Sequence, residues 1–162
     1  MTTTRTQFEV VYRFEADLTN VVPIGLVPEG IRFDVAFRGK ITAGALAGRP
    51  IEGIDYLLLR ADGVGVIDAR EQIESVDGRA IALHAQGYVV PPNGLQLPPP
   101  DVLLSPDFRW PDLSFSLHGA VFGQCGSPEW AWLNRSVLAF AGWVNLGTSR
   151  LLVTSHALNP IP

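Results

Sequence analysis

Two Asp-Gly pairs separate three runs of alternating residues, and this arrangement limits the possible folds more than any other feature. The first run covers residues 54–60 and ends at Asp62-Gly63, and the second covers 64–74. Asp77-Gly78 then precedes a third run at 79–88. An Asp-Gly pair in a short gap favours the positive φ angles of a tight hairpin turn, and alternation with a period of two is typical of strands. The three runs therefore predict an antiparallel meander.

Similar alternation predicts strands elsewhere, at 8–16, 31–38, 114–122, 130–141 and 150–157. The glycine-punctuated stretch 39–49 is compatible with a bent strand. The chain has 16 glycines and 13 prolines, and no segment shows capped helical periodicity. Many short strands indicate an all-β sandwich or a closed antiparallel β-barrel. Closure removes strand edges that promote aggregation, and Lys40 is the single lysine available to protect one.

Composition limits the classes of function. With 162 residues, of which 47% are hydrophobic, residues 1–162 fit one domain with a full core. The formal net charge of −4 opposes binding to duplex nucleic acid, which requires a basic face. No apolar signal segment opens the chain, and no apolar run reaches the roughly 18 residues of a membrane span. We expect a cytoplasmic protein without a membrane or nucleic-acid partner.

The sequence contains none of the standard catalytic or metal-binding motifs. Cys125 is the single cysteine, which excludes an internal disulfide and predicts a small buried side chain. The histidines, at positions 84, 118 and 156, lack His-x-His spacing, which leaves assembly of all three in a barrel as the one route to a metal site. We therefore expect neither a metal nor a cofactor. The low content of charged residues, 17%, and the abundance of apolar residues predict a homodimer.

Residues 91–111 differ from the rest of the chain. They contain seven prolines together with apolar residues such as Leu97, Phe108 and Trp110. Proline fixes φ and lacks a backbone donor, so the segment cannot pair inside a sheet. It is either an apolar loop wrapped over the barrel or a lid over the mouth of a cavity, and these two interpretations are compatible.

Two neighbouring predicted strands each carry a polar face. In 64–74, Asp68, Arg70 and Gln72 share one face, and Ile67, Ala69, Glu71 and Ile73 share the other. In the next strand, His84 and Gln86 share a face. This face is either the solvated outside of an antiparallel sheet or a polar patch inside a ligand-binding barrel, and alternation alone does not choose between them.

Two further sites place polar groups among apolar ones. Asp55 lies in an apolar run between Ile54 and Tyr56, where a carboxylate is costly unless it is paired or protonated. It is either half of a buried Asp–Arg pair or a general acid/base in a dry pocket. Trp130, Trp132 and Asn134 share a face of the strand predicted at 130–141. They form either a ligand-binding wall or a core strand whose Asn bonds to loop backbone.

Several short segments, in order along nearly the whole chain, resemble the domain-of-unknown-function family 3237 (DUF3237). The matching pieces are Tyr12–Phe14, Gly30–Arg32, Gly39–Gly44, Leu46–Gly48, Gly53–Tyr56, Arg60–Gly63, Ile67–Arg70, Asp77–Gly78 and Trp132–Arg135. The sequence departs from the family at Tyr56, where Trp is typical, and at Ala131, where Tyr is common. The resemblance implies a closed, lipocalin-like barrel of the calycin or allene-oxide-cyclase type. It implies no established reaction, and it makes Asp55, Asp68, Arg70, Trp132 and Asn134 candidate site residues.

By analogy of fold, small barrels of this kind either carry apolar molecules or catalyse cyclisation and isomerisation in a shaped cavity. We therefore hypothesise a cofactor-free isomerase, cyclase or lyase of specialised or catabolic metabolism. Asp55 would be the general acid/base, Arg70 would polarise a substrate oxygen with the help of Asp68, and Asn134 would stabilise an oxyanion. The alternative is a carrier or sensor without catalysis.

The remaining candidate residues are predicted to contact the substrate, which would be a small apolar, aromatic or polyketide-like molecule. They are Tyr56, Asp68, His84, Trp110, Trp130 and Trp132. The direction of the Asp55 and Arg70 side chains tests the enzyme hypothesis, which fails as stated if both point to solvent.

Overall fold

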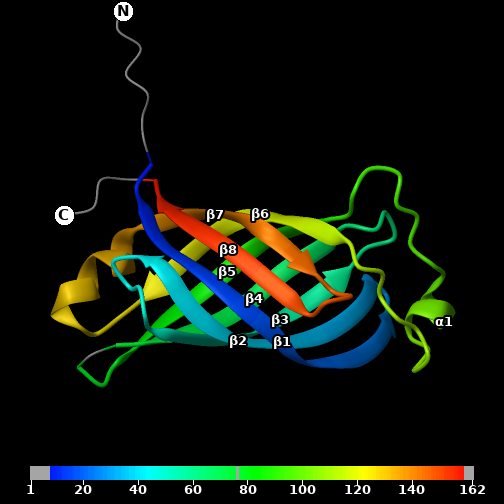
Figure 1. Ribbon diagram of the computed structural model, residues 1–162, viewed down its shortest axis with the longest axis horizontal. Helices are drawn as coiled ribbons and strands as arrows, with labels where there is room; N and C mark the ends of the chain where they lie inside the picture. Colours follow the sequence, from blue (N-terminus) through cyan, green and yellow to red (C-terminus); the bar gives the residue numbers. More distant parts are fainter. Residues whose placement is uncertain (1–7, 76, 159–162) are drawn as a thin grey trace, which may run out of the picture.

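The computed structural model describes residues 8–75 and 77–158. In this part of the chain, eight antiparallel strands pair in sequence order, and the last pairs with the first to close a barrel (Figure 1). The predicted closed antiparallel barrel is thereby confirmed. The strands are β1 (Val10–Val27), β2 (Gly30–Gly44), β3 (Pro50–Leu59), β4 (Gly65–Glu74), β5 (Ala80–Val90), β6 (Ser114–Gln124), β7 (Val137–Asn145) and β8 (Arg150–Ala157).

The predicted meander corresponds to β3, β4 and β5, and both Asp-Gly pairs form its turns. Gly63 has a φ of 84° and Gly78 a φ of 79°, a region that favours glycine. In the first turn the Asp62 carboxylate accepts the backbone N–H of Val64 at 3.1 Å, and Asp77 accepts that of Arg79 at 3.1 Å in the second. These local hydrogen bonds explain why the turns could be identified from sequence.

The first two strands extend beyond the predicted runs. Strand β1 pairs with β8 only as far as Asp17, whereas its pairing with β2 continues to Val27. The distal part of the β1–β2 hairpin therefore continues past the end of β8. Strand β2 also takes in the first part of the stretch predicted as a bent strand, but it ends at Gly44, where φ reaches 89° and a turn follows.

The prediction of a strand beginning at Trp130 is wrong. Residues Pro128–Arg135 form a 3₁₀ helix, η1, and β7 begins only at Val137. Pro128 stands in the first turn, where its fixed φ suits a helix and its missing N–H costs nothing. Helix η1 lies at one end of the barrel (gold in Figure 1), with Trp130 and Leu133 buried beneath it.

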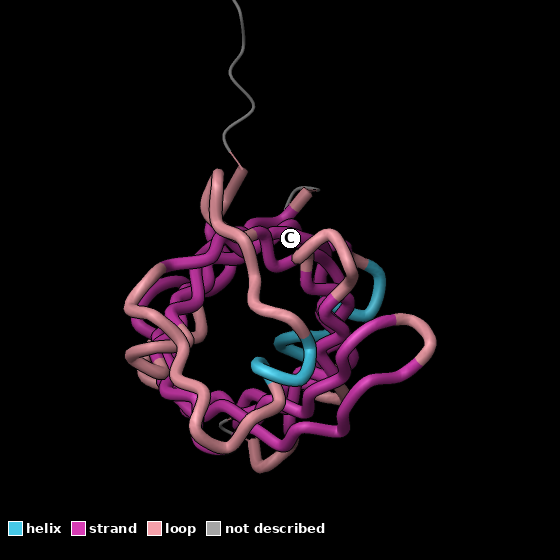
Figure 2. The backbone as a smooth tube through the Cα atoms, turned by 90° about the vertical axis from the view of Figure 1, so that its right-hand side faces the viewer, coloured by secondary structure: helices cyan, strands magenta, loops and turns pink. Residues whose placement is uncertain are grey.

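The Pro-rich loop lies over the opposite end, as predicted. It contains one short helical turn, α1 (Pro100–Leu103), and Figure 2 shows the loop and this helix crossing the opening. Leu103 is 6% exposed and packs in one hydrophobic cluster with Ile31, Phe33 and Val35 of β2. The loop is therefore anchored by apolar packing.

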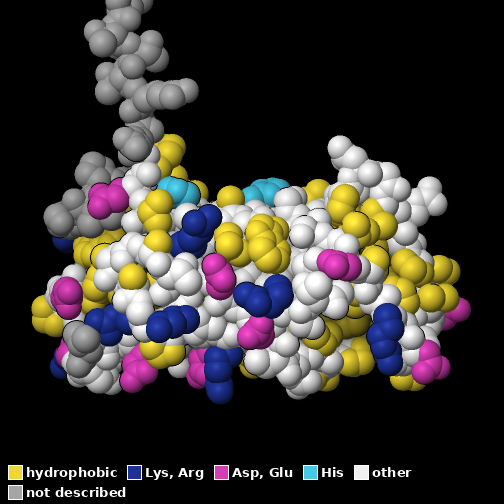
Figure 3. All heavy atoms as spheres, viewed as in Figure 1, with side chains coloured by type: hydrophobic (Ala, Val, Ile, Leu, Met, Phe, Trp, Pro, Cys, Tyr) yellow, Lys and Arg dark blue, Asp and Glu magenta, His cyan; other side chains and the backbone are white. Residues whose placement is uncertain are grey.

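The barrel interior holds the main hydrophobic core. Phe14 stacks on Phe37 with ring centroids 5.8 Å apart, and Trp110 packs edge-on against Phe115 at 6.0 Å. On the face drawn in Figure 3, Lys and Arg side chains are interspersed with Asp and Glu side chains and do not gather into a patch of one sign. None of the described helices has the length and apolarity needed to cross a membrane.

Candidate functional site

The interior of the barrel contains two adjoining chambers, of about 80 and 130 Å³. Both are lined almost entirely by apolar side chains, and they share Leu18, Val35, Leu57, Val89 and Leu146. The smaller chamber, called here the inner chamber, reaches Asp55, Glu71 and Tyr12. The larger one lies beneath Leu97 and Trp110 of the Pro-rich loop. Of the predicted site residues, Asp55 and Trp110 therefore face the interior.

Asp55 stands at an interruption in the β3–β4 ladder. Strand pairing joins Asp55 to Ala69 and resumes only at Leu58 and Val66, which leaves a gap in the ladder. In this gap the Asp55 carboxyl accepts a hydrogen bond from the backbone N–H of Asp68 at 2.9 Å. Removal from bulk water raises the pKa of Asp55 to about 7. The N–H of Asp68 opposes this rise, the Asp68 carboxylate adds to it, and the Arg32 guanidinium opposes it.

A second carboxyl, that of Glu71, lines the same chamber and was not among the predicted site residues. Glu71 is 7% exposed, and its Oε2 has no hydrogen-bond partner among the described residues. Burial, reinforced by the charge of Asp55, raises the pKa of Glu71 to about 8. The signal was present in the sequence, because alternation places Glu71 on the face of β4 that carries Ile67, Ala69 and Ile73.

Two buried hydroxyl groups accompany these carboxyls. Tyr12 of β1 and Ser155 of β8 are cross-strand partners, and neither is more than 1% exposed. Burial, with the charge of Glu71 as the next cause, raises the pKa of Tyr12 well above its usual range. The hydroxyls of Tyr12 and Ser155 stay neutral at physiological pH and can act only as hydrogen-bonding groups.

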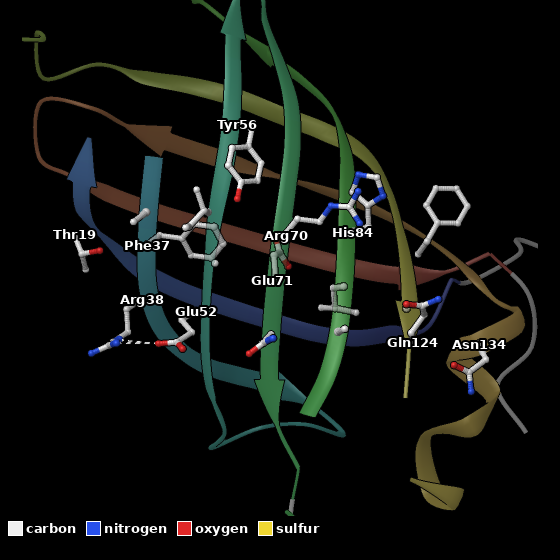
Figure 4. Close-up of a pocket in the computed structure, with 18 residues that line it drawn as sticks. Thr19, Phe37, Arg38, Glu52, Tyr56, Arg70, Glu71, His84, Gln124 and Asn134 are labelled. Atoms are coloured by element: carbon white, nitrogen blue, oxygen red, sulfur yellow. Dashed lines mark hydrogen bonds and ion pairs between the residues drawn. The ribbon is translucent and has the colours of Figure 1, made fainter. Parts of the chain in front are cut away.

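Four other predicted site residues line a groove of about 680 Å³ on the outer face of the sheet, called here the outer groove. They are Tyr56, Arg70, His84 and Asn134, which Figure 4 shows along strands β3 to β5 and on η1. Arg70 therefore points away from Asp55, across the thickness of the sheet. The predicted partnership between Asp55 and Arg70 is not formed.

The ion pairs of the outer face also differ from the predicted ones. Asp68 does not position Arg70, since its carboxylate lies 2.6 Å from Nε2 of His84. The Arg32 guanidinium pairs with Asp34 at 2.8 Å and lies over the Tyr56 ring, 5.2 Å from its centre. Arg32 influences Asp55 through its charge but forms no ion pair with it.

The predicted site residues on helix η1 pack against the barrel or bond to the neighbouring loop. The Asn134 amide accepts the Cys125 N–H and donates to the Cys125 carbonyl, both at 2.9 Å. This arrangement agrees with the alternative in which Asn134 bonds to loop backbone. Trp130 is 5% exposed and Trp132 packs against the core, so both cover the barrel end instead of forming a ligand-binding wall. Cys125 is buried, as expected.

Within the described ranges, 8–75 and 77–158, no group of three or more His, Cys, Asp or Glu side chains is arranged to hold a metal ion.

Comparison with known proteins places this architecture in a family. Residues 6–146 match the family described as "Protein of unknown function (DUF3237)". The chain belongs to the DUF3237 family. This confirms the resemblance seen in the short sequence segments, whereas no curated protein is significantly similar to the chain.

Solved structures similar to this DUF3237 protein share its fold. A protein of unknown function from Clostridium acetobutylicum has a TM-score of 0.74 at 19% identity, with 95% of this chain and 100% of that chain covered. A β-barrel-like protein from Acinetobacter baumannii has a TM-score of 0.70 at 20% identity, covering 94% and 96%. An enzyme from Penicillium herquei has a TM-score of 0.55 at 19% identity, covering 96% and 99%. At this level of sequence identity, the similarity to these structures establishes the barrel fold and nothing about function.

Proposed function

We propose that this DUF3237 protein is a cofactor-free enzyme that performs acid–base chemistry on a compact apolar molecule inside the barrel. The observation that carries the proposal is that two carboxyls with raised pKa values, those of Asp55 and Glu71, line one apolar chamber. Buried carboxyl pairs whose environments raise their pKa values are typical of acid–base sites.

The protonation of the pair suits this task. With the pKa of Asp55 at about 7 and that of Glu71 at about 8, the pair holds about one proton near neutral pH. Asp55 has the lower pKa and is the ionised member of the pair, because the Asp68 N–H stabilises its carboxylate. Glu71 has the higher pKa and keeps the proton, so it is the member that can donate a hydrogen bond. Asp55 would remove a carbon-bound proton while Glu71 protonates or hydrogen-bonds the substrate oxygen.

This assignment changes the roles expected from sequence. Arg70 and Asn134 lie on the outer face, so the polarising role moves to Glu71. For carbonyl compounds, isomerisation, cyclisation and elimination share removal of a proton next to the carbonyl group as a first step, and the two carboxyls are suited to that step.

The size of the interior narrows the class of substrate. A dry cavity of roughly 150 Å³ holds one benzene molecule. The inner chamber, which both carboxyls line, measures about 80 Å³, and the adjoining chamber measures about 130 Å³. A molecule with a single ring would therefore occupy both chambers, and a polyketide-sized ligand requires displacement of the Pro-rich loop. The Penicillium herquei relative is called an enzyme, which is consistent with a catalytic barrel in this fold.

Exchange of the α-protons of cyclohexanone in D₂O, followed by proton NMR, tests the proposal. The wild-type protein is expected to accelerate exchange, and Asp55→Asn to reduce the protein-dependent rate at least about 100-fold while cyclohexanone still binds. Glu52→Gln is the matched control, because Glu52 lies on the same strand but on the outer face, paired with Arg38. Its exchange rate should equal that of the wild type.

The same experiment separates the enzyme from a carrier. Binding of cyclohexanone without accelerated exchange contradicts catalysis and supports the carrier alternative, for which the apolar chamber walls are the supporting observation. Retention of the full rate in Asp55→Asn would rule out the assigned base.

A further inference from the structure

We propose that the outer groove is a second binding site, independent of the barrel interior, for a monoanionic carboxylate attached to an apolar ring. At about 680 Å³ the groove lies within the range of roughly 300–1,000 Å³ usual for small-molecule sites. It is lined by residues of six adjacent strands, β1 to β6, and of η1.

A free guanidinium marks the centre of the groove. Among the described residues that line it, Arg70 is the only cation without an ion pair or hydrogen bond, because Arg38 is held by Glu52 at 2.9 Å. Figure 4 shows the Arg70 side chain extending toward the His84 ring, its cross-strand neighbour. Arginine recognises carboxylates through two parallel charge-assisted hydrogen bonds.

Apolar side chains flank this charge on both sides. Ile54, Arg70, His84 and Phe122 form one row across β3, β4, β5 and β6, as their pairing registers show. Ile54 is 39% exposed and Phe122 is 45% exposed, so both offer open apolar surface to a ligand. Adjacent strands lie about 4.8 Å apart, so the row spans about 14 Å. An aromatic or alicyclic ring would pack on Phe122 or Ile54 while its carboxylate reaches Arg70.

The surrounding charges select a monoanion. Asp68, next to Arg70 on the outer face, carries a carboxylate whose one partner is His84, and Glu52 is balanced by Arg38. A single free cation beside these acids neutralises one negative charge, whereas a phosphate dianion would be repelled by the carboxylate of Asp68. The site is therefore assigned to carboxylates and not to phosphate esters.

Titration of the ¹⁵N-labelled protein with benzoate tests this assignment, with benzyl alcohol and phenyl phosphate as the neutral and dianionic comparisons. Benzoate is expected to shift the resonances of residues around Arg70, His84 and Phe122 and to bind at least about tenfold more tightly than either comparison. Equal affinity for benzyl alcohol, or no binding of benzoate, would overturn the proposal.

Variants locate the binding. Arg70→Gln should weaken benzoate binding at least about tenfold. Arg70→Lys keeps the positive charge but loses the two parallel N–H donors of the guanidinium, so its affinity for benzoate should lie between those of Arg70→Gln and the wild type. Arg13→Gln is the matched control, since Arg13 is exposed on β1 outside the groove, and it should leave affinity unchanged. Arg70 is exposed, so these variants should keep the spectrum of the folded protein.

The interior proposal and this one fail separately. Asp55→Asn alters the inner chamber, and since Asp55 does not line the outer groove, this variant should leave benzoate affinity unchanged. Loss of benzoate binding in Asp55→Asn together with its retention in Arg70→Gln would place the ligand in the barrel and contradict the outer site.

Discussion

At the scale of single residues, strand β4 shows how alternation gives charged side chains opposite environments. Asp68 faces outward, where His84 and solvent stabilise its charge. Glu71 faces inward, where its Oε2 finds no partner among the described residues. An unpaired carboxylate in an apolar interior is costly, so the group retains its proton. The native state therefore binds protons that the unfolded chain releases.

The first prediction concerns the pH dependence of stability. Because the pKa values of Asp55 and Glu71 are raised to about 7 and about 8, the folded state holds more protons than the unfolded state above pH ~4. Their contribution to the free energy of unfolding is complete below that pH and is lost as the pH rises through the folded pKa values. Glu71→Gln should therefore stabilise the protein by about 5 kcal/mol at pH 9 relative to wild type, with little effect at pH 4.

Urea unfolding at both pH values measures this difference. The outward Glu74→Gln, on the same strand, is the control and should show no such dependence. A Glu71→Gln variant that is equally destabilised at both pH values would contradict the raised pKa.

A second prediction concerns Asn134. Its two hydrogen bonds to the Cys125 backbone hold η1 against the end of β6. Asn134→Ala should lower the free energy of unfolding by about 1–3 kcal/mol, because buried backbone groups lose their partners. Thermal and urea denaturation measure the change, and Gln124→Ala in the same groove is the control. Unchanged stability would show that water replaces the amide.

At the scale of elements, the ends of the barrel are closed by two different devices. Helix η1 closes one end with the buried Trp130 and Leu133. The Pro-rich loop closes the other, where Leu103 is the fully buried anchor of α1. Since proline removes backbone donors, the loop depends on side-chain packing for its position. Leu97 and Trp110 of this loop line the larger interior chamber, so the position of the loop determines the shape of that chamber.

The third prediction follows from that dependence. Leu103→Ala should release the loop and raise the rate of thermolysin cleavage within 91–111 by about tenfold, because a large-to-small change in a packed site costs about 2–5 kcal/mol. Val102→Ala is the matched control, since Val102 is the adjacent residue and is 42% exposed. Equal cleavage rates in the two variants would contradict the anchoring role of Leu103.

Elements governed by local chemistry were predictable from sequence, and those governed by packing were not. The Asp62-Gly63 and Asp77-Gly78 turns are encoded by their own side chains, so β3, β4 and β5 could be located. The span 128–135 alternates like a strand, but Pro128 and the burial of Trp130 against the barrel end favour a 3₁₀ helix. The candidate site was predictable in part. Alternation places Asp68 and Arg70 on one face of β4 and Glu71 and Ile73 on the other. Which of the two faces points into the barrel depends on how the barrel closes, and alternation does not show this.

At the scale of the whole molecule, the distal β1–β2 hairpin leaves apolar side chains uncovered. Val21, Val22, Ile24 and Leu26 are 47%, 42%, 54% and 67% exposed, beyond the point at which β1 leaves β8. Pro23 lacks a donor and the register shifts between Pro23 and Gly25, which opposes pairing of this strand edge with another strand. Side-chain packing between two hairpins remains as a way to cover the patch.

The fourth prediction is a homodimer formed through this hairpin. Light scattering should give a mass twice the monomer mass of 17.6 kDa, and Ile24→Asp should restore the monomer because it places a charge in an apolar contact. Tyr88→Asp, on β5 and 44% exposed, is the control and should stay dimeric. A wild-type monomer at micromolar concentration would contradict the prediction.

The barrel wall at Asp68 is a single strand thick, and this residue is bonded on both of its sides. Its peptide N–H holds the Asp55 carboxyl inside, and its own carboxylate holds His84 outside. The charge of the Asp68 carboxylate on the outer face also raises the pKa of the Asp55 carboxyl on the inner face. Asp68→Asn would therefore lower the pKa of Asp55 while leaving the hydrogen bond from the backbone N–H of residue 68 in place. One residue of the wall thus sets the proton affinity of a group on its other side.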